Sequence, residues 1–303
     1  MRLISIMAVI LFSILSCYSK KGTENNGITD AIKEGRDILI SNKTFADDID
    51  LTNILKSNRE AGDIFRANIA SSITFENCIF NGKFSAYRQE GTAKHFLSFA
   101  RNLTFTKCTF NKEANFRGIA VNGIVEINET MFNDKVVFEE AHFMNDAHFG
   151  KCFFEAEARF QNCFFNMRAD FMNSGFTKVA SFQGTQFNHD AQFGVTKFRE
   201  YADFTLTRYN AGAFFNYAEF LKQGVFDDSK FEGRVEFLTA TISSASLRNC
   251  FFFGDVKFVN AKVKEKLDIG KSTFYYGAPK LDGVPENTIK KEGTRYTTLT
   301  DLK

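Results

Sequence analysis

The 303-residue chain contains no tryptophan, only 2 prolines and 4 histidines, and its formal net charge is only +2. A charge so close to zero gives no support to a polyanionic partner or to mimicry of an acidic polymer. Hydrophobic residues make up 44% of the chain and charged residues 24%, a balance that excludes a disordered or collagen-like protein. Phenylalanine is in great excess, with 38 copies, and any model of the fold must account for it.

Long hydrophobic runs are also missing, except at the N-terminus. Leu3 to Leu15 form an apolar run behind Arg2, which has the length of a signal-peptide core and is short for a membrane span. The run ends in Ile14-Leu15-Ser16-Cys17, which resembles a bacterial lipoprotein lipobox. The resemblance implies that Cys17 is lipidated and anchors the chain to a membrane of the cell envelope. Leucine at the second place departs from the commonest pattern, so ordinary signal cleavage, giving a secreted or periplasmic protein, is the alternative.

Phenylalanine recurs along the chain with a regular beat. Steps of 5 and 6 residues, taken alternately from Phe105 to Ile242, give 26 positions that are all apolar or aromatic, 22 of them Phe. The residue two places before each position is never charged and is often Ala. Such steps mark no single face of a helix, whereas residues i and i−2 share a face of a strand. The pattern therefore predicts short extended segments separated by turns, which is typical of a solenoid.

The residues that follow the beat indicate the length of one full coil. Asn166, Asn188 and Asn210 recur at a constant interval that equals four successive steps of the beat. Each coil is therefore expected to have four sides and about 22 residues, which lies within the range of known solenoid repeats. The beat slips once, between Ile242 and Leu247, where we expect one corner residue to be missing.

Several segments carry the resemblance to a known family: "ADFMNSGF" (169–176), "AQFGVTKF" (191–198), "ADFTLTRY" (202–209) and "ANFRG" (114–118). They resemble pentapeptide-repeat proteins, whose repeat is A(D/N)LXX with Leu or Phe at its centre, here with one extra residue in every second repeat. The resemblance implies an all-β fold, a right-handed, four-sided parallel β-helix.

On this fold the phenylalanine rings are expected to stack at the strand spacing of about 4.8 Å. The residues expected in this core ladder are Phe105, Phe110, Phe116, Phe138, Phe149, Phe160, Phe171, Phe182, Phe193, Phe204, Phe215, Phe226 and Phe237.

The patterns divide the chain into five parts. The repeat "ITFENCIF" (73–80) echoes "LTFTKCTF" (103–110) at a separation longer than one coil, which predicts an inserted loop. The expected parts are a signal peptide with lipobox (1–17), a flexible tether (18–27), a small N-terminal cap and first coil or coils with a loop at 81–98 (28–98), the β-helix (99–274), and a C-terminal tail or cap (275–303).

The residues that usually carry chemistry show no grouping along the chain. Cys152 and Cys163 are half a coil apart and should lie on opposite sides, which disfavours a disulfide, so the cysteines are expected to serve as small structural residues. No ligand set surrounds the histidines, and we expect neither a metal nor a cofactor. A coil of this length is narrow and convex, whereas catalytic sites are usually concave, so we expect a protein that is not an enzyme.

Outward aromatic residues are the candidate partner surface: Phe153, Phe164 and Phe214. They fall on more than one side of the expected rod. Residues one coil apart in outward places, such as Glu126, His148 and Asp170, form columns of mixed character, so no nucleic acid partner is expected.

These observations favour a non-catalytic, lipid-anchored scaffold or protein-interaction module of the bacterial cell envelope. Its expected partners are the membrane, through the N-terminal lipid, and an unknown envelope protein or a second copy joined through the coil ends. Some pentapeptide-repeat proteins imitate DNA and bind type II topoisomerases, so a cytoplasmic topoisomerase-binding protein is the alternative. An envelope enzyme is a second alternative, which requires that the loop at 81–98 and the caps build a pocket with converging carboxylates.

Overall fold

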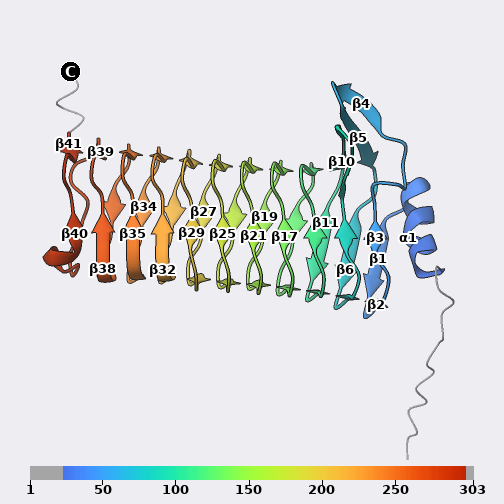
Figure 1. The fold of residues 1–303 in the computed structure, drawn as a ribbon, viewed down its shortest axis with the longest axis horizontal. Helices are drawn as coiled ribbons and strands as arrows, with labels where there is room; N and C mark the ends of the chain where they lie inside the picture. Colours follow the sequence, from blue (N-terminus) through green and yellow to red (C-terminus); the bar gives the residue numbers. More distant parts are fainter. Residues whose placement is uncertain (1–22, 298–303) are drawn as a thin grey trace, which may run out of the picture.

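Pairs of a small residue and an aromatic residue form strands that are mostly two residues long and pair with the next coil rather than with a neighbour in sequence. The computed structural model describes residues 23–297, in which these strands stack into one long rod (Figure 1). Equivalent strands of successive coils pair in parallel; Ala147, Ala169, Ala191 and Ala213, for example, are in register, each one coil after the last. The expected four-sided parallel β-helix, in which one coil takes 22 residues, is confirmed.

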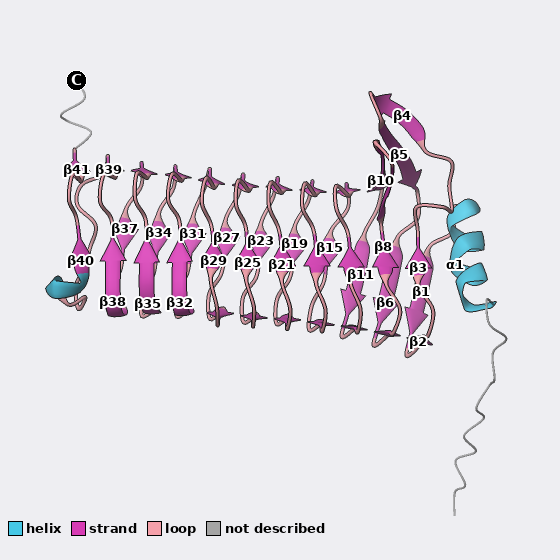
Figure 2. Cartoon of the chain, in the orientation of Figure 1, coloured by secondary structure: helices cyan, strands magenta, loops and turns pink. Residues whose placement is uncertain are grey.

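We number the four sides by their order along the chain (Figure 2). Side 1 is a ten-stranded sheet of β1 (Ile38–Ser41), β6 (Ile73–Glu76), β11 (Leu103–Thr106), β15 (Val125–Glu126), β19 (Ala147–His148), β23 (Ala169–Asp170), β27 (Ala191–Gln192), β31 (Ala213–Phe214), β34 (Val235–Glu236) and β37 (Val256–Lys257).

Sides 2 and 3 belong to one eighteen-stranded sheet. Side 2 contains β2 (Thr44–Phe45), β7 (Ile79–Phe80), β12 (Thr109–Phe110), β16 (Met131–Phe132), β20 (Phe153–Phe154), β24 (Gly175–Phe176) and β28 (Lys197–Phe198). Side 3 contains β3 (Ile49–Asp50), β8 (Phe84–Ser85), β13 (Ala114–Asn115), β17 (Val136–Val137), β21 (Ala158–Arg159), β25 (Ala180–Ser181), β29 (Ala202–Asp203) and β40 (Ile289–Lys290). Three longer strands run through both sides: β32 (Glu219–Val225), β35 (Thr241–Ser246) and β38 (Lys262–Asp268).

Side 4 is a thirteen-stranded sheet. Its rod strands are β10 (Ala93–Phe99), β14 (Ala120–Val121), β18 (His142–Phe143), β22 (Phe164–Phe165), β26 (Gln186–Phe187), β30 (Arg208–Tyr209), β33 (Lys230–Phe231), β36 (Phe251–Phe252), β39 (Thr273–Phe274) and β41 (Arg295–Tyr296). The sheet is completed by β4 (Asn58–Ala61), β5 (Ile64–Ile69) and β9 (Tyr87–Glu90) at its N-terminal end.

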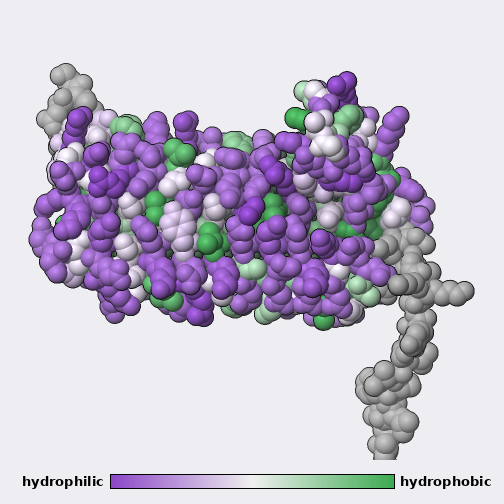
Figure 3. Space-filling model, in the orientation of Figure 1, coloured by the Kyte–Doolittle hydropathy of each residue, from purple (hydrophilic) through white to green (hydrophobic). Residues whose placement is uncertain are grey.

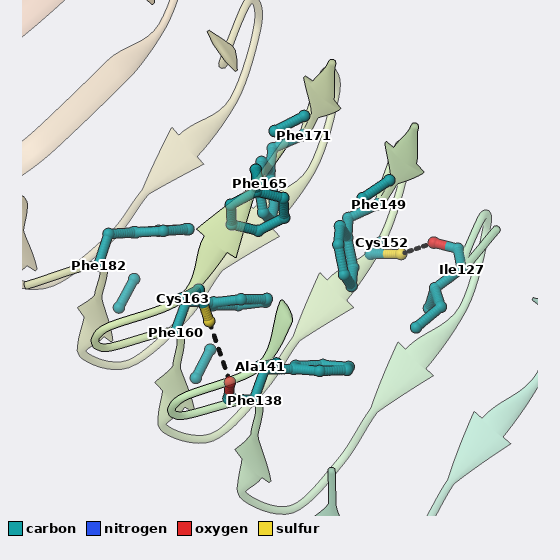
Figure 4. Close-up of a cluster of buried hydrophobic side chains, with 14 of the residues drawn as sticks. Ile127, Phe138, Ala141, Phe149, Cys152, Phe160, Cys163, Phe165, Phe171 and Phe182 are labelled. Carbon is teal, nitrogen blue, oxygen red and sulfur yellow. Dashed lines mark hydrogen bonds between the residues drawn. The ribbon is translucent and has the colours of Figure 1, made fainter. Parts of the chain in front are cut away.

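The interior of the rod is filled by phenylalanine ladders, and all thirteen ladder residues named from the sequence are buried. Phe171 stacks on Phe149 and Phe193 at centroid distances of 4.9 and 5.0 Å, and its ring meets those of Phe160 and Phe182 edge to face (Figure 4). Stacking within a side and edge contacts between sides are the two favourable arrangements of aromatic rings. The excess of phenylalanine is therefore the material of a continuous core.

Two of the four corners are tight turns built on a residue with positive φ. The carbonyl of Phe160 accepts a hydrogen bond from the backbone N–H of Cys163, and Asn162 between them has a φ of 55°. Glycine and asparagine tolerate this conformation best, and Gly118 and Gly184 occupy the equivalent corner of other coils. The other two corners carry the sixth residue, which explains the alternation of 5 and 6.

Small polar residues behind these turns connect one coil to the next. The Ser174 hydroxyl donates to the Phe149 carbonyl at 2.6 Å and accepts from the backbone N–H of Cys152 at 3.0 Å. The Cys152 thiol in turn donates to the Ile127 carbonyl at 2.7 Å (Figure 4). Serine, threonine and cysteine at these places therefore satisfy buried backbone groups that neither strand pairing nor the turn reaches.

Helix α1 (Thr23–Lys33) covers the N-terminal end of the rod, and the buried Ile28, Ala31 and Ile32 seal its core. The helix begins inside residues 18–27, so the expected tether is wrong for residues 23–27. The reason is that Ile28 and Ile32 lie four residues apart and share one apolar face. Within residues 23–297, no helix combines the length and apolar character that a membrane crossing requires.

The rod also extends past residue 274, where the sequence predicted a tail or cap. Ile289 of β40 pairs with Leu267, and Tyr296 of β41 with Phe274, again one full coil apart. A short 3₁₀ helix, η1 (Glu286–Thr288), lies within the irregular segment that replaces the first two sides of this coil. The expectation of no further coil was wrong because only the two sides that resume pairing keep the period.

Two hairpins at the N-terminal end project from the rod as a wing, which we define as β4, β5, β9 and β10 (Figure 1). Strands β9 and β10 pair in an antiparallel hairpin that accounts for most of the loop expected at 81–98, and β4 pairs with β5 in the same way. Strands β5 and β10 pair in parallel and continue into side 4.

Candidate functional site

Side 4 presents a straight row of outward side chains that begins at the wing and ends at the C-terminal coil. The strand register brings Ala120, His142, Phe164, Gln186, Arg208 and Lys230 into one column. This is a column that the repeat period predicted. From β10 to β41 the ten strands span about 43 Å at about 4.8 Å per strand. Because the wing rises from the same edge of the rod that carries β39 and β41 (Figure 1), side 4 forms a platform with a wall at one end.

The wall is fastened rigidly to the platform. The Arg66 guanidinium donates to the Leu97 and Gly118 carbonyls at 3.3 and 2.9 Å and pairs with Glu60 at 2.8 Å. Gly118 is required here, because an added Cβ would lie 2.2 Å from the Phe96 ring. These contacts join β5, β10 and the first corner beyond them, so the wing is held in one position relative to the platform.

A notch of about 320 Å³ lies where the wing meets the platform. Glu60, Arg66 and Lys94 approach from the wing, and Glu140 and His142 from the rod. Burial lowers the pKa of His142, and the nearby Arg66 charge lowers it further, so the imidazole is neutral at pH 7 and can accept or donate a hydrogen bond. The notch therefore offers polar groups of both signs at the foot of the wall.

The opposite end of the platform carries an exposed aromatic patch, which we define as Phe251, Phe253, Tyr275 and Tyr276. Phe251 is 43% exposed and Tyr276 60% exposed. The Phe253 ring stacks on Tyr275 at 4.5 Å, and the Lys230 ammonium lies 5.0 Å from the centre of the same ring. These four aromatics on two adjacent coils, β36 and β39 with the residues that follow them, form a contiguous apolar surface beside basic residues.

The surface facing the viewer in Figure 3 differs from this patch, because it is largely hydrophilic with isolated hydrophobic spots. Scattered apolar residues of this kind are ordinary on soluble proteins, whereas gathered ones mark an interaction site.

The structure places the three predicted partner residues on three different sides. Phe153 lies on side 2 and is 48% exposed. Phe164 lies on the platform, half-buried, with its ring 5.8 Å from that of His142. These two residues do not belong to one patch.

The prediction for Phe214 was wrong, because its side chain is only 7% exposed on side 1. The ring lies over Gly212, where an added Cβ would approach it to 2.4 Å, and the Arg234 guanidinium covers it at 5.0 Å. An outward-pointing aromatic is thus hidden by neighbours from its own corner and from the next coil.

The other predicted features fall into two groups. Cys17, the predicted lipidation site, lies outside the described residues. The five cysteines among residues 23–297 are free and buried. Within that same range, no group of three or more His, Cys, Asp or Glu residues is arranged to hold a metal ion.

Comparison with known proteins identifies the repeat. Residues 138–186 match a family model described as Pentapeptide repeats (9 copies). This stretch consists of pentapeptide repeats. A solved structure of a trypsin-treated variant of QnrB1, described as a plasmid-mediated fluoroquinolone resistance protein, is 17% identical to the chain with a TM-score of 0.25. The match covers 73% of this chain and 88% of that chain. No curated protein matches.

Sequence reasoning missed the aromatic patch and half of the wing. Phe251 was recognisable as an outward aromatic, but Tyr275 and Tyr276 lie where the beat ends and were assigned to a tail. The hairpin of β4 and β5 carries a usable signal, since Gly62 and Asp63 separate two short extended runs and Gly62 has a φ of 52°.

Proposed function

We propose that this protein is a non-catalytic interaction module that binds a partner protein along the platform of side 4. The observation that carries the proposal is the contiguous aromatic patch at the end of the platform, on the same side of the rod as the wing. Aromatic residues dominate the energetics of protein interfaces because they bury much area at a small cost in conformational entropy.

The patch is rigid before any partner arrives. Phe253 is held between its stacking contact with Tyr275 and its contact with Lys230, and both strands belong to the stacked core. A surface that is already ordered loses less side-chain entropy on binding. The length of the platform, with a wall at one end and an anchor at the other, suits an elongated partner.

The charges of the platform argue against the topoisomerase-binding alternative. Arg208, Lys230 and Arg295 all stand on strands of side 4, and the corresponding column of side 1 mixes Glu126, His148, Asp170 and Gln192. An imitation of DNA needs a continuous acidic face. Neither column supplies one.

Site-specific photo-crosslinking in the producing cell tests the proposal. A photoreactive phenylalanine analogue placed at Phe251 is expected to give a protein adduct, whose mass distinguishes a different protein from a second copy of the chain. The same analogue placed at Phe153 is the matched control, because Phe153 is 48% exposed on another side. Adding Phe253→Ala to the Phe251 chain should lower the adduct yield severalfold. Equal adducts from both positions, or none from Phe251, would contradict a binding platform.

Lipid attachment at Cys17 is the second part of the proposed function. Residues 18–22 lie between Cys17 and α1 and reach at most about 18 Å when extended, so the anchor would hold the N-terminal end of the rod close to the membrane. Metabolic labelling with a fatty acid should mark the native chain, with a mature N-terminus at Cys17, and should not mark Cys17→Ala. An unlabelled chain that begins at Met1 would refute both the anchor and the envelope location.

A further inference from the structure

A second surface feature lies away from the platform, at the corner between sides 2 and 3. In earlier coils this corner is bent, but in three successive coils it is straightened into the continuous strands β32, β35 and β38. The register shifts between Phe220 and Gln223 of β32, and again between Ile242 and Ser244 of β35. The coil of β35 is therefore one residue shorter than the coils on both sides of it, as the slip of the beat predicted.

The missing residue creates a trench. A shorter path through the corner draws the middle strand inward, while the two neighbouring strands keep their extra residue and bulge outward. The floor is formed by Ser243 and Ser244, and the walls by Lys222 and Gln223 on one side and Glu265 and Lys266 on the other. Glu200 and Tyr201 extend the trench toward the preceding coil, and the whole groove has a volume of about 780 Å³, in the range of small-molecule sites.

The chemistry of the lining selects one class of ligand. Two carboxylates and two ammonium groups balance, so the trench exerts no net attraction on a polyanion or a polycation. The Ser243 hydroxyl is 3.0 Å from a Glu265 oxygen, and the groove presents hydroxyl, amide, carboxylate and ammonium groups together. Such a mixture of donors and acceptors matches hydroxyl groups, each of which both donates and accepts. The Tyr201 side chain, whose residue is 36% exposed, adds a flat apolar surface for the C–H face of a sugar ring.

We propose that this trench binds a neutral oligosaccharide chain. The distance from β32 to β38 is two strand spacings, about 10 Å, which admits a single chain lying over the serine floor. The breaks in an otherwise regular repeat coincide with the groove, and local departures from a fold's own rules are typical of functional sites. The proposal is independent of the platform, because it uses a different corner of the rod.

Calorimetric titration of the full chain with the hexasaccharides of β-1,4-linked glucose and of β-1,4-linked N-acetylglucosamine tests it. At least one should bind saturably, and Tyr201→Ala should weaken binding about tenfold, which corresponds to about 1.4 kcal/mol. Tyr217→Ala is the control, because Tyr217 is exposed at the corner between sides 1 and 2, and it should leave the affinity unchanged.

A second variant tests the trench itself. Inserting one asparagine after Ser243 restores the full coil length and should abolish binding while the circular dichroism spectrum of the β-helix persists. If neither sugar binds, or if both variants bind as the native chain does, the proposal is overturned. Tighter binding of polyglutamate than of either sugar would overturn the ligand class.

Discussion

Replacing Phe171 with alanine is expected to lower the free energy of unfolding by about 4 kcal/mol, the typical cost of removing a fully buried phenylalanine. The Phe171 side chain is fully buried and contacts four other phenylalanine rings. Those rings are fixed by strands of three successive coils, so they cannot move in to fill the cavity. In a solenoid each coil is stabilised only by its neighbours, and the loss falls in the middle of the stack.

Urea unfolding followed by circular dichroism measures this loss, and Phe153→Ala is the matched control. Phe153 is the same residue type, but it is 48% exposed, so its replacement should cost less than about 1 kcal/mol. Similar losses for the two variants would show that the interior ladder does not dominate the stability of the rod.

Raising the pH above about 9 is expected to destabilise the protein through its buried thiols. Burial raises the pKa of Cys108, Cys152 and Cys250 from 9.0 to about 12. Below pH 9 these thiols are protonated in both the folded and the unfolded chain, so the pH has no effect. Between pH 9 and 12 only the unfolded chain releases their protons, and folded stability falls by up to about 1.4 kcal/mol per pH unit for each thiol.

Urea unfolding near pH 8 and near pH 11 measures the effect. The variant with Cys108→Ala, Cys152→Ala and Cys250→Ala should lose several kcal/mol less between the two conditions than the native chain. A thiol-specific reagent should react with these cysteines only after unfolding, because it requires an accessible thiolate. Rapid labelling of Cys152 in the folded protein would contradict the burial on which the prediction rests.

The regular part of the rod was predictable because a repeat places its own neighbours. When the period is constant, the residue beside His142 on side 4 must be Phe164, and the register agrees. The burial of Phe171 followed from the same arithmetic. The slip at Ile242 also predicted a short coil, although not that the corners around it would straighten into β32, β35 and β38.

The departures from the repeat were beyond sequence reasoning. Phe214 looks outward by position, but its exposure depends on Gly212 and on the reach of Arg234 from the next coil. Residues 275–288 hide the continuation of the rod, because β40 and β41 are recognised only by the partners they find in β38 and β39.

By itself the sequence determined the solenoid, its period, its interior ladders and the small residues behind its turns. Each of these depends on local alternation and on contacts at one constant separation, which a linear pattern records directly. Only the tertiary structure decided which outward residues gather: the aromatic patch on side 4, the notch beneath the wing and the serine-floored trench. Those surfaces join residues from several coils and from the insertions between them, and their exposure depends on how far each neighbouring side chain reaches.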